Sequence, residues 1–215
     1  MKFIERVREI LLHPRATWPV IEREAGDSRS IFVDYLVYIA AVPAVAGFIG
    51  MSLVGIGGFG RTLRLPVGSG LVQMVAGYLL SLAIVYVTAR LVDAIAPAFG
   101  GVRSRLNALK VVAYGSTAGF LAGLFSLVPA LAWFGVLASL YSVYLLYTGL
   151  PVLMKCPPGK AAGFTAVVVL LGIVAMIVLA SLSSLLLPAH MMDGMHGRHG
   201  GPARTAAAGG APAFA

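Results

Sequence analysis

Long runs of apolar residues alternate along this chain with short polar connections, and the runs have the length of membrane-spanning helices. A bilayer core about 30 Å thick needs roughly 20 apolar residues in a helix. The fold class predicted from this pattern is all-α, a polytopic membrane helical bundle with five transmembrane helices. The predicted spans are residues 35–56, 71–89, 111–127, 132–153 and 162–187.

The third and fourth spans are inferred from a single stretch of 44 residues without a charge, Val111–Met154. This stretch is too long for one helix and is about right for two. Pro129 divides it, because proline lacks a backbone donor and clashes with the preceding helical turn. We therefore expect an antiparallel hairpin with a very short turn.

The composition excludes a soluble protein. Of the 215 residues, 59% are apolar and 11% are charged, and the mean hydropathy is +0.92. A soluble domain has about a quarter of its residues charged. With so few charges, most of the apolar surface must face lipid. The single cysteine, Cys156, excludes an internal disulfide framework and a multi-cysteine metal finger.

The basic residues predict the orientation. Twelve of the sixteen lie in residues 1–30, 90–110 and 155–160, which fall on one side of the membrane. The positive-inside rule then places the N-terminus in the cytoplasm and the C-terminus outside. The basic residues never form a dense run, so a nucleic-acid partner is not expected, and the lipid bilayer is the expected partner of these charges.

Three regions are expected along the chain. We predict a cytoplasmic amphipathic or interfacial segment at residues 1–30, a five-span membrane domain at 31–187 and a disordered extracytoplasmic tail at 188–215. The first segment starts with an amphipathic pattern, and Thr17 is expected to cap a second short helix that contains Trp18 as an interfacial anchor. This segment is either a docking surface for a cytoplasmic partner or an anchor that seats the first span.

The tail contains a cluster of imidazole and thioether side chains. Such groups together suit copper ions, and an extracytoplasmic tail would meet them. The alternative is a low-complexity tail under little constraint. The candidate metal ligands are His190, Met191, Met192, Met195, His196 and His199.

Uncharged polar side chains gather in the third and fourth spans. Tyr141, Tyr144 and Thr148 share one helix face by their spacing. Two interpretations stay open, a hydroxyl-lined cavity or hydrogen bonds between helices, each worth roughly 1 kcal/mol. The candidate polar face comprises Tyr114, Ser116, Tyr141, Tyr144 and Thr148.

A glycine repeat in the third span predicts close helix packing. Gly115, Gly119 and Gly123 recur every four residues, so a neighbouring helix can approach one side of the span closely. The repeat could serve the fold itself or a homo-oligomer.

Ionisable groups at membrane depth would indicate a functional site, but the charges lie at span ends. Asp34 lies at the mouth of the first span, and Arg90 and Asp93 end the second, where they can pair on one helix face. The absence of a midplane charge argues against an ion-coupled pump. No catalytic constellation or cofactor motif is present in the sequence, so we expect neither an enzyme nor a cofactor.

Three stretches of the sequence carry a recognisable pattern. They are Leu11–Ala25 (LLHPRATWPVIEREA), Ala108–Pro129 (ALKVVAYGSTAGFLAGLFSLVP) and Leu137–Val169 (LASLYSVYLLYTGLPVLMKCPPGKAAGFTAVVV). Together they resemble the Yip domain family of membrane proteins (Ypt-interacting proteins), in its bacterial branch. The YLLYTGLPVLMKCP portion is the most specific. The resemblance runs from about residue 5 to 185 and implies a five-helix membrane domain in a bacterial inner membrane.

Eukaryotic members of that family bind Rab-type GTPases and act in vesicle traffic. This chain has an N-terminal segment of only about thirty residues, so GTPase binding is not expected to carry over. The leading hypothesis is a non-enzymatic scaffold that organises the membrane or binds a membrane-protein partner or a second copy. The alternative is a conduit, a transporter or scramblase for a small solute, metal ion or lipid along the polar face of the third and fourth spans.

Overall fold

The computed structural model describes residues 3–58, 61–63, 66–128 and 131–186. Within these ranges it contains five helices that are long and apolar enough to cross a membrane. They are Ser28–Val54, Val67–Phe99, Arg105–Leu127, Trp133–Leu153 and Pro158–Val178, and we refer to them as spans 1 to 5. The predicted all-α fold with five transmembrane helices is therefore confirmed.

Several spans are built from more than one helical segment. Span 1 consists of α3 (Ser28–Ser30), the π-helical segments η1 (Ile31–Leu36) and η2 (Ile49–Val54), and α4 (Val37–Phe48) between them. Span 2 consists of α5 (Val67–Ile95) and η3 (Ala96–Phe99). Span 3 consists of α6 (Arg105–Gly115), α7 (Thr117–Ala122) and η4 (Gly123–Leu127). Span 4 lies in α8 (Ala132–Leu153), and span 5 lies in α9 (Pro158–Leu186).

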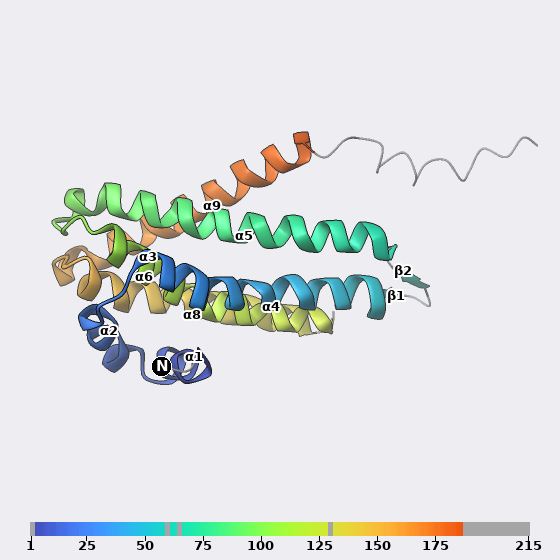
Figure 1. The fold of residues 1–215 in the computed structure, drawn as a ribbon, viewed down its shortest axis with the longest axis horizontal. Helices are drawn as coiled ribbons and strands as arrows, with labels where there is room; N and C mark the ends of the chain where they lie inside the picture. The colour runs from blue at the N-terminus through green and yellow to red at the C-terminus, as the bar shows by residue number, and fades with distance from the viewer. Residues whose placement is uncertain (1–2, 59–60, 64–65, 129–130, 187–215) are drawn as a thin grey trace, which may run out of the picture.

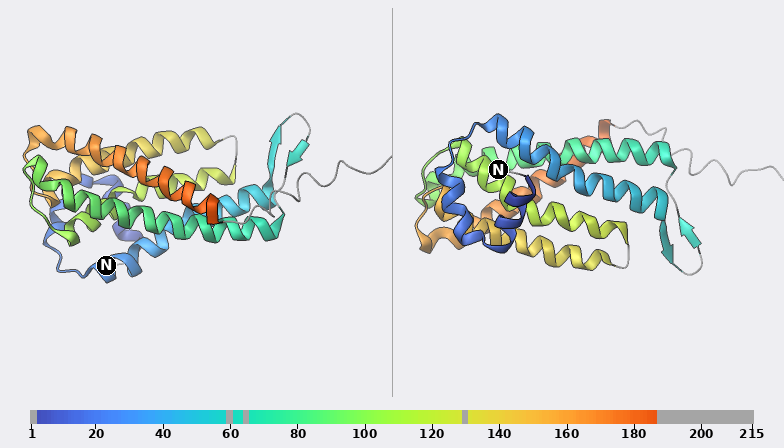
Figure 2. Two further views of the ribbon diagram at one scale, coloured as in Figure 1. Left: turned by 90° about the horizontal axis from the view of Figure 1, so that it is seen from above. Right: turned by 60° about the horizontal axis from the view of Figure 1, so that its bottom comes forward.

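The spans run side by side in alternating directions (Figure 1). One end of the bundle carries the connections before span 1, between spans 2 and 3, and between spans 4 and 5; we call it the basic end, since most of the basic residues belong to it. The opposite end, called here the hairpin end, carries two short antiparallel strands. These are β1 (Ile56–Gly58) and β2 (Arg61–Leu63), which pair with Gly57 opposite Thr62 (Figure 2).

Span 3 is the centre of the bundle. In its most apolar window 61% of residues are buried, against 11% to 28% in the other spans. Its segment α6 packs against α5 and α8, while α7 packs against α8 and α4. The most polar of the five spans is thus the one most enclosed by protein, which is where polar groups in a membrane protein find partners.

The glycines of span 3 lie where its neighbours approach. A Cβ atom at Gly115 would lie 2.6 Å from Leu146 Cδ2, and one at Gly123 would lie 2.3 Å from Pro43 Cβ. Gly115 therefore allows span 4 to approach span 3 closely, and Gly123 allows span 1 to do so. The structure uses these glycines for packing within one chain.

Two helices precede the spans, α1 (Phe3–Leu12) and α2 (Pro14–Arg23), and they lie across the side of the bundle at the basic end (Figure 2). The expectation that Thr17 caps the second helix is wrong. The helix begins at Pro14, whose fixed φ suits the first helical position. Thr17 lies one turn inside, and its hydroxyl donates to the carbonyls of His13 (2.8 Å) and Glu9 (3.1 Å).

Candidate binding site at the basic end

Trp18 fastens the N-terminal helices to span 4. Its side chain is completely buried, and its indole Nε1 donates a hydrogen bond of 3.0 Å to the hydroxyl of Thr148. The indole fits because span 4 has no side chain at Gly149, where a Cβ would lie 2.7 Å from the ring. Burying a tryptophan whose N–H is bonded stabilises a contact strongly. Helix α2 is therefore a packed part of the bundle.

The predicted polar face lies under the N-terminal helices. Thr148 accepts from Trp18, as above, and the Tyr141 hydroxyl donates to the carbonyl of Leu11 at the end of α1 (2.7 Å). The Tyr144 ring contacts that of Tyr141, with centroids 5.5 Å apart. The three side chains thus share a face, as their spacing indicated, and two of them bond to the chain's own N-terminal segment.

The remaining polar side chains of span 3 meet spans 1 and 4. The Tyr114 ring packs against Tyr35, with centroids 4.4 Å apart, and the Tyr35 hydroxyl pairs with that of Thr117 at 2.6 Å. Ser116 lies at the junction of α6 and α7. This junction is followed by Gly119, whose backbone N–H donates to the hydroxyl of Ser142 on span 4 (2.7 Å).

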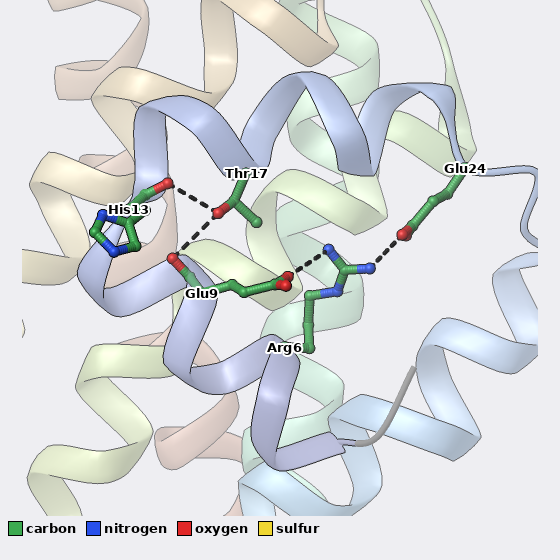
Figure 3. A network of polar contacts seen from close by, with 5 residues as sticks. All are labelled: Arg6, Glu9, His13, Thr17 and Glu24. Carbon is green, nitrogen blue, oxygen red and sulfur yellow. Dashed lines mark hydrogen bonds and ion pairs between the residues drawn. The ribbon is translucent and has the colours of Figure 1, made fainter.

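A charged network joins α1 to the end of α2. The Arg6 guanidinium lies between the carboxylates of Glu9 and Glu24 and forms an ion pair with each (Figure 3). Arg6 is 5% exposed. A buried charge is tolerated when it is paired and bonded, so the network holds the two helices at a fixed angle.

Lys110, near the start of span 3, binds the other end of this network. It is 3% exposed, and its Nζ donates to the backbone carbonyls of Ile21 (2.7 Å) and Glu24 (2.8 Å). These carbonyls belong to the last turn and C-cap of α2, where a helix has unpaired acceptors and the negative end of its dipole. The ammonium group therefore caps α2 from inside the bundle.

A cavity of about 250 Å³ lies where α1, the end of α2 and the first turns of spans 1 and 3 meet. Its wall includes two cations, Arg6 and Lys110, and two carboxylates, Glu24 and Asp34. Tyr35 adds a hydroxyl-bearing ring. The opposing charges are suited to a polar or zwitterionic group, and the described lining offers no nucleophile held by a general base. The arrangement suits binding.

The predicted interfacial charges occupy three different environments. Asp34 is exposed at the rim of the cavity. The expected pairing of Arg90 with Asp93 is wrong within the described residues: the Arg90 side chain is exposed, whereas Asp93 Oδ1 is buried without a hydrogen-bond partner there. A long arginine side chain at a span end can extend so that its charged head reaches the membrane interface.

One further ion pair ties α2 to the connection between spans 4 and 5. Lys155 Nζ lies 2.5 Å from Glu22 Oε1. The hydrogen bond and charge of Lys155 hold the pKa of the Glu22 carboxyl below its usual value of 4.5. The pair is thus formed at neutral pH. It adds a surface contact to the buried ones made by Trp18 and Lys110.

The candidate copper ligands cannot be placed in this site. His190, Met191, Met192, Met195, His196 and His199 lie outside the described residues. In the part of the chain that is described, no group of three or more histidine, cysteine, aspartate or glutamate side chains could hold a metal ion.

Sequence reasoning missed Arg6, Glu24 and Lys110 as site residues. Their positions, two in the N-terminal segment and one at a span end, are typical of surface charges. One signal was present: Lys110 directly precedes the uncharged stretch from Val111, one helical turn inside the span. A lysine at that position needs either a route to the surface or buried acceptors, and here it has acceptors.

Comparisons with known proteins agree with this architecture. The model of the Yip1 domain family matches residues 8–179. Inner membrane protein YohC of Escherichia coli (strain K12) is 30% identical over 179 residues, which cover 81% of this chain and 91% of that protein. The protein of the same name from Escherichia coli O6:H1 matches with the same identity and coverage. No solved structure matches the chain.

Proposed function

This chain belongs to the Yip1 domain family, as the resemblance of its sequence predicted, and on this premise we propose that it is a non-enzymatic scaffold that binds partners through its basic end. Family and relatives make it a multi-pass protein of the bacterial inner membrane. The scaffold role is a further step, and it rests on how the polar groups of the bundle are used.

One observation carries the proposal: the N-terminal helices are docked on the hairpin of spans 3 and 4 by buried contacts. Trp18, Lys110 and Tyr141 each bind across this junction. The docked helices present exposed side chains outward, among them Arg8 and Arg15. A rigid charged surface beside the membrane suits recognition of an acidic segment of another protein.

In-cell photo-crosslinking tests the proposal. A photoreactive amino acid at Arg8 or Arg15 is compared with one at Val136, which is 63% exposed on span 4. We expect one discrete product of the same mass from both basic-end positions and none from Val136. Coexpression of two differently tagged copies identifies a second copy as the partner. Equal, diffuse crosslinking from all three positions would contradict the scaffold role.

The alternative function, a conduit along spans 3 and 4, has less support. Its motivation was the hydroxyl cluster, yet Tyr141 and Thr148 bond to the N-terminal helices and Ser142 bonds to Gly119. Two features favour it: the cavity at the basic end, between these helices and the spans, and a mainly apolar cavity of about 410 Å³ beside spans 3 and 4, whose lining includes Ala118, Ala122 and Tyr141. Reconstituted liposomes that transport a solute or scramble lipid above the rate of empty vesicles would favour the conduit.

A further inference from the structure

A second cavity opens between spans 1 and 2, toward the hairpin end and away from the site described above. Its volume is about 290 Å³, near the lower end of the roughly 300–1,000 Å³ typical of ligand pockets. Most of its wall is apolar or small. Its lining includes Ala44, Gly47 and Ser52 of span 1 and Gly70, Gln73 and Gly77 of span 2.

The cavity is a groove in the outer surface of the bundle. Gln73 and Gly77, which line it, are exposed. A Cβ atom added at Gly47 or at Gly77 would meet no other atom within 4 Å. Neither glycine is therefore required by helix packing, and the space above each of them is open to the lipid.

A buried, unpaired hydroxyl lies in the wall of this groove. Ser52 is 6% exposed, and its Oγ has no hydrogen-bond partner among the described residues. The atom faces Gly70, where a Cβ would lie 2.1 Å from it. A buried hydroxyl without a partner costs free energy, so a ligand that offers an acceptor would be stabilised here.

Gln73 places a second polar group at the same end of the groove. No hydrogen bond joins its amide to another described residue. Span 2 has 33 residues, about 50 Å of helix, so about 10 Å extends beyond each face of a centred 30 Å hydrocarbon core. Gln73 lies six residues from the start of the span, about 9 Å along the helix. Its amide is therefore near the membrane depth of lipid ester groups.

Along most of spans 1 and 2 and their connection, the charged residues are all positive. Between Asp34 and Asp93 the chain has no acidic residue, and the connection of spans 1 and 2 contains Arg61 and Arg64. Arg61 begins strand β2 at the hairpin end (Figure 1). A phosphate group above the ester level would thus meet a connection with net positive charge.

We propose that this groove binds a glycerophospholipid, with an acyl chain over Gly47 and Gly77 and an ester carbonyl at Ser52 and Gln73. Along the groove, apolar residues are followed by hydrogen-bonding groups and then by cationic residues. The acyl chain, ester and phosphate of a glycerophospholipid follow one another in the matching order. A helix from a second copy would fill the apolar part and would leave no acceptor for Ser52. The lipid is a ligand of spans 1 and 2 and does not depend on the scaffold role of the basic end.

Native mass spectrometry tests the site. The protein is extracted, delipidated and incubated with palmitoyl-oleoyl phosphatidylglycerol, and bound lipid per chain is measured. Gly77→Phe fills the groove, and Gly68→Phe is the matched control, because a Cβ at Gly68 also meets nothing and Gly68 does not line the groove. We expect one retained lipid in the wild type and in Gly68→Phe, and loss of it in Gly77→Phe.

Ser52→Ala removes the hydroxyl while leaving the groove open, and it should weaken lipid binding about three-fold, as expected for one hydrogen bond. Thermal unfolding of each variant, monitored by tryptophan fluorescence, checks that the variant is folded. Equal lipid retention by folded Gly77→Phe and Gly68→Phe overturns the proposal. So does a dimer without bound lipid that dissociates in Gly77→Phe, since a second copy would then be the occupant.

Discussion

The contact between spans 3 and 4 and the groove between spans 1 and 2 contain the same kinds of residue but differ in how far neighbouring side chains fill the space beside them. Both contain glycines and hydroxyls at helical spacing. At spans 3 and 4, Leu146 fills the space beside Gly115, and the Ser142 hydroxyl accepts a hydrogen bond from the backbone N–H of Gly119. Between spans 1 and 2, Gly47 and Gly77 face open space, and Ser52 has no partner among the described residues.

Small and hydroxyl residues in a membrane helix therefore have no fixed structural role. They allow close packing where a neighbouring element fills the space, and they form a groove where none does. The N-terminal helices are the deciding element at spans 3 and 4, because they cover the polar face that is otherwise left open.

Trp18→Ala should have the largest effect. Removing a fully buried tryptophan usually costs about 3–5 kcal/mol, and here it also leaves the Thr148 hydroxyl without its donor. Chemical or thermal unfolding in micelles measures the free energy of unfolding. Trp133→Ala is the matched control, since Trp133 is 60% exposed. Equal destabilisation by the two substitutions would show that α2 is not docked on span 4.

Gly123→Ala should follow, with a loss of about 2 kcal/mol from forced repacking. The added Cβ would lie 2.6 Å from the Cα of Pro43, which is backbone and cannot rotate away. Gly77→Ala makes the same chemical change at the open groove and should leave the melting temperature unchanged or slightly raised. If both variants have the same melting temperature, the proposed difference between the packed glycines of span 3 and the open groove of spans 1 and 2 is wrong.

Tyr141→Phe should cost about 1 kcal/mol, the net value of one hydrogen bond. The substitution keeps the ring and removes the donor to the Leu11 carbonyl. Hydrogen exchange should then rise in α1 and stay unchanged in span 5. Tyr147→Phe serves as the control, because the Tyr147 ring is exposed. A uniform rise in exchange along the chain would contradict a local role for this bond.

Acidification should have the smallest effect on this docking. Because Lys155 lowers the pKa of Glu22 in the folded protein, the ion pair stabilises the fold above the unfolded pKa of about 4.5. This contribution is lost as the pH falls through the lowered folded-state pKa. A Glu22→Gln variant should therefore lack that part of the acid dependence, measured as melting temperature against pH. An identical pH profile would show that the pair adds nothing.

The number and class of the spans could be predicted from the sequence, because hydrocarbon thickness sets the length of an apolar helix. The glycine spacing likewise indicated close packing along span 3. The contacts of the candidate site could not be predicted in the same way. Trp18 and Thr148 are 130 residues apart, and an aromatic residue before the first span is equally typical of an interfacial anchor.

The charges show the same limit. Lys110 and Arg6 look like span-end cations, and only the docking of α2 reveals the carbonyls and carboxylates that surround them. Arg90 and Asp93 have the right spacing for a pair, yet the Arg90 side chain is exposed and Asp93 Oδ1 is buried without a hydrogen-bond partner among the described residues. Local spacing predicts which side chains can meet, while tertiary packing decides which of them do.

The accessibility of a cysteine introduced at position 148 tests most directly whether the N-terminal helices cover the polar face of spans 3 and 4. Thr148→Cys is made with Cys156→Ala, and Ala25→Cys, which is exposed, gives the fully reactive reference. Because Thr148 is part-buried and accepts a hydrogen bond from Trp18, reaction with a small water-soluble maleimide in intact membranes should be slower at position 148 than at position 25 and should become faster once Trp18→Ala is added. Reaction at position 148 as fast as at position 25, with Trp18 in place, would contradict the account.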